Sequence, residues 1–139
     1  MTTFSWPIRV YYEDTDATGV VYHARYLQYF ERARTEWLRA RGLSQQELRS
    51  RHQVVFTLSN LEVDYLRPAR LDDELVATAV LSQLRRVSFT FSQVLHYKGR
   101  PDAVLARARV RVGCVGEASF KPCALPDEFL EVVSNGVSV

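Results

Sequence analysis

The sequence predicts an α+β protein in which one long helix packs against an antiparallel β-sheet. Two observations lead to this prediction. Apolar residues recur at steps of three and four over one stretch only, residues 22–40, which is typical of an amphipathic helix. From residue 54 onward, apolar and polar residues alternate through long segments joined by short connections, as in antiparallel strands with one buried face. The helix and a curved sheet can bury their apolar faces against each other.

Length and composition are those of an ordinary globular protein. The 139 residues, of which 47% are hydrophobic and 24% charged, predict a single domain spanning residues 1–139. We find no signal peptide and no apolar run long enough to cross a bilayer, and therefore expect a soluble, cytoplasmic protein. The formal net charge of +2 is too small to predict nucleic-acid binding. Cys114 and Cys123 lack the companion ligands of a zinc site, and we expect them to be free, buried thiols.

The first predicted elements are a short strand over residues 7–12 and the long helix. An acidic turn, EDTDATG, separates them. Gly42 stands where a residue with left-handed backbone ends a helix. Glu31 and Arg34 have the spacing of an ion pair on the helix surface. The apolar stripe consists of Tyr26, Leu27, Phe30, Ala33, Trp37 and Ala40.

Four strands are expected after the helix. In the first, residues 54–65, the apolar positions change parity at Ser59 and Asn60, as a β-bulge in one long strand would cause. The polar segment before it and the C-terminal tail each have room for one helical turn. Exposed sheet edges predict association with another copy. The three later strands cover residues 75–81, 87–97 and 106–114.

The acidic turn is the strongest candidate for chemistry. Asp14 and Asp16 precede the helix, and such loop aspartates ordinarily form Asx turns or helix caps. Here residues 17–21 intervene, and the first helical turn, YHAR, has no acidic residue to accept its N–H groups. Free N–H groups at a helix start suit a carbonyl that develops negative charge, and a nearby ionised aspartate can attack that carbon or activate water. The pattern indicates acyl transfer.

A phosphatase is the competing interpretation of the same residues. The run DTDAT matches the D-x-D-x-T pattern of haloacid-dehalogenase-type phosphatases, in which the two carboxylates bind magnesium. That fold requires a buried parallel strand before the motif and alternating strands and helices after it. The half-polar strand RVYYE and the succession of strands after one helix do not fit.

Residues 11–42, YYEDTDATGVVYHARYLQYFERARTEWLRARG, resemble the signature of hot-dog-fold acyl-CoA thioesterases of the YbgC and 4-hydroxybenzoyl-CoA thioesterase type. The resemblance continues at DYLRPARLDDEL and LRRVSFTFSQVL, and so covers nearly the whole chain. It implies a long helix wrapped by a curved antiparallel sheet. It also implies hydrolysis of acyl-CoA to a free acid and CoA without a metal or redox cofactor, and homodimers that often pair into homotetramers.

The resemblance assigns roles to individual residues. It implies that Asp16 is the catalytic carboxylate and that Asp14 is structural. The backbone N–H of His23 would hold the thioester carbonyl, and its side chain would assist. The histidine places the chain nearer YbgC, because the 4-hydroxybenzoyl branch has an aromatic residue there. Arg85 and Arg86, at a strand-to-strand turn, match a basic turn that contacts the phosphates of CoA.

Other interpretations stay open. A hot-dog protein can instead bind an acyl carrier, or act as a scaffold in envelope or lipid metabolism with little catalysis. The Asp/His motif of hot-dog dehydratases is not found. Arg107, Arg109 and Arg111 alternate and so share one face, which we interpret first as the wet side of the sheet, and otherwise as an oligomer contact or a phosphate site. The sequence leaves open the acyl length and the choice between CoA and an acyl carrier.

Overall fold

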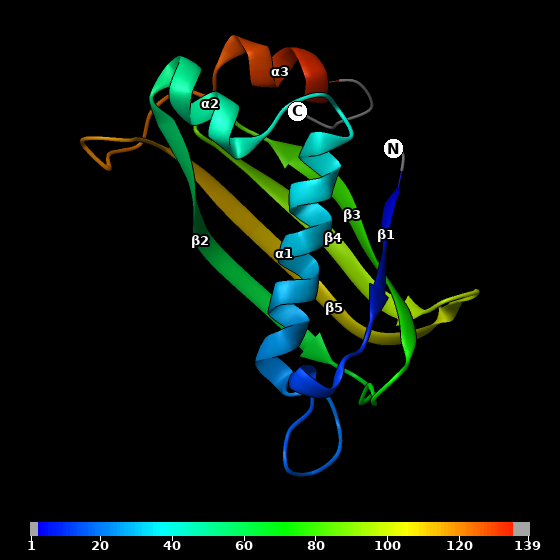
Figure 1. The fold of residues 1–139 in the computed structure, drawn as a ribbon. Helices are drawn as coiled ribbons and strands as arrows, with labels where there is room; N and C mark the ends of the chain where they lie inside the picture. The colour runs from blue at the N-terminus through cyan, green and yellow to red at the C-terminus, as the bar shows by residue number, and fades with distance from the viewer. Residues whose placement is uncertain (1–2, 135–139) are drawn as a thin grey trace.

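A five-stranded antiparallel sheet curves around one long helix in the computed structural model, which describes residues 3–134 (Figure 1). The strand order is β1-β3-β4-β5-β2, so β1 and β2 are the two edges. The α+β class is confirmed. The elements are β1 (Phe4–Arg9), a 3₁₀ turn (Tyr12–Asp14), α1 (His23–Arg39), α2 (Gln45–His52), β2 (Val54–Tyr65), β3 (Glu74–Leu84), β4 (Ser88–Tyr97), β5 (Arg100–Gly116) and α3 (Asp127–Val133).

The first strand lies earlier in the chain than the alternation predicts. It spans Phe4–Arg9 rather than residues 7–12, because the chain then bends into the 3₁₀ turn Tyr12–Asp14. The side chain of Asp14 fixes this bend, since its Oδ2 accepts the backbone N–H of Tyr11 at 2.9 Å. The acidic stretch therefore begins with a closed turn at the end of the edge strand.

Helix α1 ends as predicted at a glycine with left-handed backbone. Gly42 has a φ of +84°. Its N–H donates to the carbonyl of Arg39 at 2.9 Å, and the N–H of Leu43 donates to the carbonyl of Leu38 at 3.3 Å. These two bonds are the pattern of a Schellman motif, which satisfies carbonyls at the helix end.

The predicted apolar stripe of α1 is confirmed at four of its six residues, which are all buried. Leu27 is only half-buried and Ala40 is exposed. The spacing of Glu31 and Arg34 predicted an ion pair on the helix surface, but Arg34 does not pair with Glu31. Its Nη1 instead donates to Oε1 of the buried Gln93 on β4, at 3.0 Å, because a buried amide oxygen requires a donor. The side chains that α1 buries are those of Tyr26, Tyr29, Phe30, Ala33, Trp37 and Leu38.

The predicted bulge in β2 is confirmed. Leu58 lies opposite Val112 of β5, whereas Asn60 lies opposite Arg111, so Ser59 is the additional residue. Beyond β2 the sheet has no further strand among the described residues, and Leu58 is 55% exposed at this edge. The edge is therefore free to contact another molecule.

Two short helices lie close to each other near the C-terminal end of α1 (Figure 1). Helix α2 has eight residues, more than the single turn expected, and the hydroxyl of Ser44 caps it by accepting the N–H of Glu47 at 3.1 Å. Helix α3 is the predicted last helical segment. No helix in residues 3–134 is long and apolar enough to span a membrane.

The cysteines are free, as expected, and lie side by side. Cys114 is fully buried on β5 and Cys123 is half-buried in the following segment, with their sulfur atoms 3.7 Å apart. Burial and the neighbouring Cys123 raise the pKa of the Cys114 thiol to about 12. Cys114 is therefore a neutral core thiol rather than a nucleophile.

The arginine stripe of β5 lies on the exposed outer face of the sheet. Arg107 and Arg109 stand opposite the acidic residues Asp64 and Glu62 of β2, and Arg111 donates to the hydroxyl of Ser59 at 3.1 Å. All three arginines are exposed. The interpretation as the wet side of the sheet agrees with these contacts.

Candidate active site

The loop between the 3₁₀ turn and α1 is held in one shape by its own backbone. The N–H of Asp16 donates to the carbonyl of Val20 at 2.9 Å, and Gly19 returns a bond to the carbonyl of Asp16 at 3.0 Å. Gly19 has a φ of +83°, which only glycine adopts readily. Val21 donates to the carbonyl of Ala69 at 2.8 Å and so ties the loop to the chain before β3. Asp16 is thus presented from an ordered loop next to the start of α1.

Asp16 uses one carboxylate oxygen for the loop and leaves the other free. Its Oδ1 accepts the N–H of Thr18 at 2.8 Å and also the Thr18 hydroxyl. Asp16 therefore forms an Asx turn, as loop aspartates ordinarily do. Oδ2 accepts no hydrogen bond of ordinary geometry from residues 3–134, although the N–H of Val20 lies near enough to the carboxylate to help lower its pKa. The bonds from Thr18, and to a smaller extent the charge of His23, hold the pKa of Asp16 below its usual range. The carboxylate is therefore ionised near neutral pH, with one oxygen available.

The first N–H groups of α1 have no acceptor within the described part of the chain. Tyr22 occupies the N-cap position but its side chain makes no capping bond. No carbonyl or side chain of residues 3–134 accepts the N–H of His23 or Ala24. The helix therefore begins with two free donors and the positive end of its dipole, as the absence of an acidic first turn predicted.

The side chain of His23 is exposed among aromatic rings. Its ring lies 4.5 Å from the ring of Tyr22 and 6.2 Å, edge-on, from that of Tyr65. The Tyr65 hydroxyl donates to the His23 carbonyl at 2.9 Å and so attaches β2 to the helix start. A hollow of about 290 Å³ opens here, lined by Val21, His23, Tyr26, Tyr65, Leu66, Arg67 and Pro68.

A buried polar layer under the loop was not anticipated. Asp14 is buried and faces Nε of Arg25 at 3.8 Å. The hydroxyl of Tyr29 is also buried and makes no hydrogen bond of ordinary geometry. Burial and the neighbouring Asp14 carboxylate raise the pKa of Tyr29. The helical period did not include Tyr29 in the predicted apolar stripe. Its burial depends on the loop that covers it, which only the tertiary fold places there.

Arg85 and Arg86, the arginines expected to bind the CoA phosphates, lie at the opposite end of the fold from Asp16. Arg85 and Arg86 form the exposed turn after β3, and the carbonyl of Arg86 accepts the N–H of Leu125 just before α3, at 3.0 Å. Strand β3 runs from Glu74, next to the loop, to this turn, and its eleven residues extend roughly 33 Å. One chain therefore brings Asp16 and His23 together but leaves Arg85 and Arg86 apart from them.

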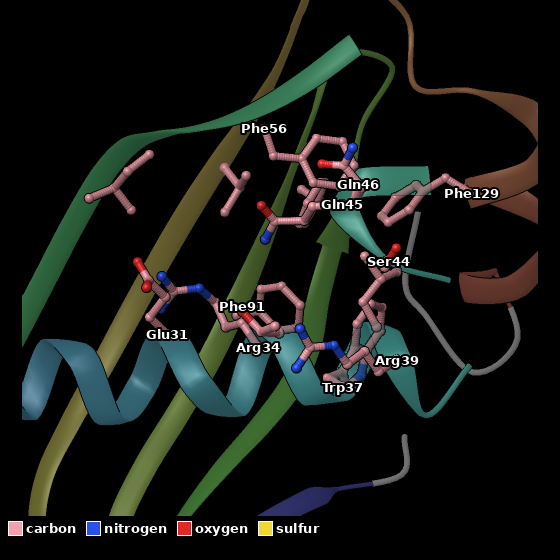
Figure 2. A pocket seen from close by; sticks show the side chains of 15 residues that line it. Glu31, Arg34, Trp37, Arg39, Ser44, Gln45, Gln46, Phe56, Phe91 and Phe129 are labelled. Atoms are coloured by element: carbon pink, nitrogen blue, oxygen red, sulfur yellow. The ribbon is translucent and has the colours of Figure 1, made fainter. Parts of the chain in front are cut away.

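A larger pocket lies between α1 and β2, which the sequence did not indicate (Figure 2). Its volume is about 590 Å³, within the range of small-molecule sites. It begins beside Glu31, roughly 12 Å along the helix from His23, counting 1.5 Å per residue. Burial lowers the pKa of Arg34 in its wall. The lining residues are Glu31, Arg34, Thr35, Trp37, Leu38, Arg39, Ser44, Gln45, Gln46, Phe56, Leu58, Phe89, Phe91, Val112 and Phe129.

The chain is similar in sequence to a known family over nearly its whole length. Residues 10–133 match the model of the thioesterase-like superfamily. The acyl-CoA thioesterase YbgC of Haemophilus influenzae is 47% identical over 125 residues, which are 90% of each chain. The acyl-CoA thioesterase YbgC of Helicobacter pylori strain J99 is 35% identical over 133 residues, covering 91% of this chain and 96% of that protein.

Solved structures agree with this assignment. The 1,4-dihydroxy-2-naphthoyl-CoA thioesterase Slr0204 from Synechocystis superposes with a TM-score of 0.88 at 27% identity, covering 97% of this chain and 98% of that one. A probable thioesterase from Bartonella henselae gives a TM-score of 0.83 at 34% identity, covering 90% and 100%. The expected hot-dog fold is confirmed, and the antiparallel sheet does not fit the phosphatase alternative. The chain belongs to the thioesterase-like superfamily of hot-dog proteins, among the relatives of the YbgC acyl-CoA thioesterases.

Proposed function

We propose that this protein is an acyl-CoA thioester hydrolase whose catalytic carboxylate is Asp16. The observation that carries the proposal is an ionised carboxylate with one free oxygen, on an ordered loop directly before a helix that begins with free N–H groups. The names of the YbgC relatives support the same activity. An acyl carrier can replace CoA in this reaction without changing the chemistry at the carbonyl.

In this mechanism the thioester oxygen lies at the start of α1. The N–H of His23, with that of Ala24, stabilises the negative charge that develops on this oxygen, and one such donor contributes about 2.7 to 4 kcal/mol in known cases. Oδ2 of Asp16 takes a proton from water as the water oxygen bonds to the carbonyl carbon, or attacks that carbon itself. The C–S bond then breaks and the thiolate leaves as CoA, taking up the proton that Asp16 accepted from water. In the route where Asp16 attacks directly, water then hydrolyses the mixed anhydride to the free acid and the Asp16 carboxylate, and a proton of that water goes to the thiolate. The steps balance without a metal or redox cofactor.

We infer that two chains are required for a complete site. The fold has Asp16 and His23 at one end of the long helix. At the opposite end of the fold lie Arg85 and Arg86, and the α1–β2 pocket extends toward them. A two-fold axis between two β2 edges makes the two strands run in opposite directions. The end of one subunit that carries the Asp16 loop would then lie beside the pocket of its partner. A homodimer is therefore the proposed working unit. The homotetramer and the cytoplasmic location stay predictions.

The test is the release of free thiol from a panel of acyl-CoA esters by wild-type protein and by Asp16→Asn. The amide keeps an oxygen for the bonds from Thr18, so the loop should keep its shape while the base is lost. We expect kcat to fall by about 10²- to 10⁴-fold, the usual contribution of a general base. Asp102→Asn, which changes an exposed carboxylate on β5, is the matched control and should retain wild-type turnover.

The possible results separate the proposal from its alternatives. Retention of most activity in Asp16→Asn would move the catalyst elsewhere. A wild-type protein that releases no thiol from any ester, yet binds an acylated carrier protein, would instead support the binding or scaffold role. Product analysis separates hydrolysis from hydration by a dehydratase.

A further inference from the structure

The two cysteines of the chain stand opposite each other where β5 ends. After β5 the chain turns back, and Pro122 pairs with Val115 in an antiparallel bridge. One residue away from this bridge, the N–H of Cys123 donates to the carbonyl of Cys114 at 3.0 Å. Residues opposed across an antiparallel pair have Cα atoms about 4.5 to 5.5 Å apart, a separation that a disulfide spans. The backbone therefore holds the two cysteines at a spacing suited to a disulfide.

The side chains of Cys114 and Cys123 also point toward each other. Their sulfur atoms are 3.7 Å apart, and a small movement brings them to the separation of about 2.0 Å found in a disulfide. Cys114 is fully buried, whereas Cys123 is half-buried and reaches solvent. Among residues 3–134, no group of three or more metal-ligating side chains includes either cysteine, so the pair lacks the ligands of a zinc site.

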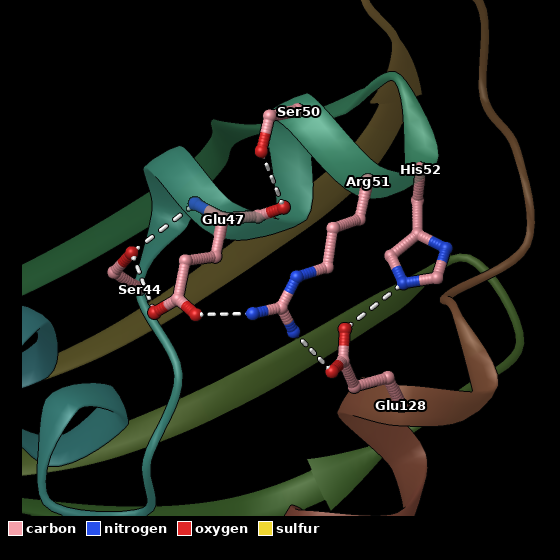
Figure 3. A network of polar contacts seen from close by, with 6 residues as sticks. All are labelled: Ser44, Glu47, Ser50, Arg51, His52 and Glu128. Atoms are coloured by element: carbon pink, nitrogen blue, oxygen red, sulfur yellow. Dashed lines mark hydrogen bonds and ion pairs between the residues drawn. The ribbon is translucent and has the colours of Figure 1, made fainter.

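Contacts on its C-terminal side keep the segment that carries Cys123 in place. The N–H of Leu125 donates to a backbone carbonyl of the turn between β3 and β4, at 3.0 Å. The helix that follows, α3, is attached to α2 because the Glu128 carboxylate binds Arg51 through one oxygen and His52 through the other (Figure 3). The folded protein therefore keeps Cys123 beside β5, within reach of the buried thiol.

We propose that Cys114 and Cys123 are a site of reversible oxidation, at which hydrogen peroxide converts the two thiols to a disulfide. Cys123 reacts first because it reaches solvent: its sulfur takes one oxygen atom from the peroxide, which leaves a sulfenic acid and releases water. The sulfur of Cys114 then bonds to that of Cys123, the S–O bond breaks, and the hydroxide departs as water with the Cys114 proton. The thiols lose two electrons, and the peroxide is reduced to two molecules of water.

The proximity of the two sulfur atoms lets a buried thiol complete this reaction. Burial raises the pKa of the Cys114 thiol, so Cys114 does not itself attack an oxidant. Its sulfur nevertheless lies 3.7 Å from that of Cys123, and well-oriented intramolecular reactions reach effective molarities of about 10⁵ M or more. Cys114 should therefore capture the sulfenic acid before more peroxide oxidises Cys123 further.

Mass spectrometry of the reduced, folded protein tests the site. The protein is treated with hydrogen peroxide in the presence of dimedone, which traps sulfenic acids, and is then unfolded and alkylated. We expect wild-type protein to lose two hydrogen atoms, to take up neither dimedone nor an alkyl group, and to regain both thiols on reduction with dithiothreitol. A glutamate-specific protease cuts after Glu117, between the two cysteines, and the resulting fragments should stay joined until they are reduced.

Single variants and the unfolded chain are the controls. In Cys114→Ala the sulfenic acid of Cys123 has no partner thiol, so the dimedone adduct should replace the disulfide; Cys114→Val is the alternative if the alanine variant folds poorly. In Cys123→Ala the buried Cys114 should keep its thiol. Wild-type protein unfolded in urea should give a ratio of disulfide to dimedone adduct at least about tenfold lower than the folded protein, because its sulfur atoms are no longer held together.

These measurements need no substrate, so their outcome does not depend on the hydrolase proposal. The inference is overturned if folded wild-type protein forms as much dimedone adduct as the Cys114 variant, or if it keeps both thiols under conditions that oxidise Cys123 in that variant. It is also overturned if peroxide leaves both proteins unchanged, or if the disulfide joins two chains. A disulfide that forms equally well in urea would show that the fold does not prepare the pair for oxidation.

Discussion

His23→Pro should remove the proposed oxyanion donor while leaving the helix intact. Residue 23 is the first helical position, where proline is favoured because its missing N–H has no intrahelical acceptor in any case. Tyr22 has a ψ of 133°, a conformation suited to the residue before proline. His23→Ala is the matched control, since it removes the same ring and keeps the N–H.

The expected size of the effect follows from the contacts of that N–H. It has no partner in residues 3–134, so its removal costs the fold no hydrogen bond and the melting temperature of His23→Pro should stay close to that of His23→Ala. Loss of one oxyanion donor should lower kcat by about 10²- to 10³-fold relative to His23→Ala. The assay is thiol release at saturating acyl-CoA, with circular dichroism to check the helix content of both variants.

Two results would refute this reasoning. If folded His23→Pro turns over within threefold of His23→Ala, the His23 N–H does not stabilise the transition state. If His23→Ala already loses as much activity as His23→Pro, the imidazole ring and not the backbone carries the effect.

Two further predictions concern Asp16 and the basic turn. The hydrogen bond from the Thr18 hydroxyl is the largest cause of the lowered pKa of Asp16, so Thr18→Val should raise that pKa. Because Asp16 acts in its ionised form, the acid limb of the pH profile of kcat/KM should move to higher pH. An unchanged acid limb would show that Asp16 is not the titrating base. Arg85→Ala with Arg86→Ala should raise KM for acyl-CoA about tenfold through loss of phosphate contacts. KM for the corresponding acyl-pantetheine thioester, which lacks the nucleotide phosphates, should not change, and an equal rise for both substrates would argue against phosphate binding.

Local patterns in the sequence predicted those elements whose cause is local. The helical period located α1 to within a residue at its start, and Gly42 located its end, because both depend on neighbouring residues. The parity change at Ser59 predicted the bulge, since one inserted residue reverses the side of every later side chain. The edge strand was placed three residues too late, because the bond from Tyr11 to the Asp14 side chain ends it early.

Side chains whose partners lie far along the chain were the ones misjudged. Arg34 was expected to pair with Glu31 on its own helix but contacts Gln93, fifty-nine residues away. Phe129 carried no signal beyond a short apolar tail, yet its ring packs against Phe56 and Phe89 in the pocket. The residues that neighbour Arg34 and Phe129 in the sequence give no indication of these long-range contacts.

The sequence by itself determined the local features at the start of α1: the acidic loop, the absence of an acidic first helical turn, and hence the free N–H groups of the helix start. These features follow from residues within one short stretch. Only the tertiary structure decided that Asp16 keeps one oxygen free, that a pocket opens between α1 and β2, and that Arg85 and Arg86 lie at the opposite end of β3. Their positions depend on how the sheet curves around the helix, which joins segments distant in sequence.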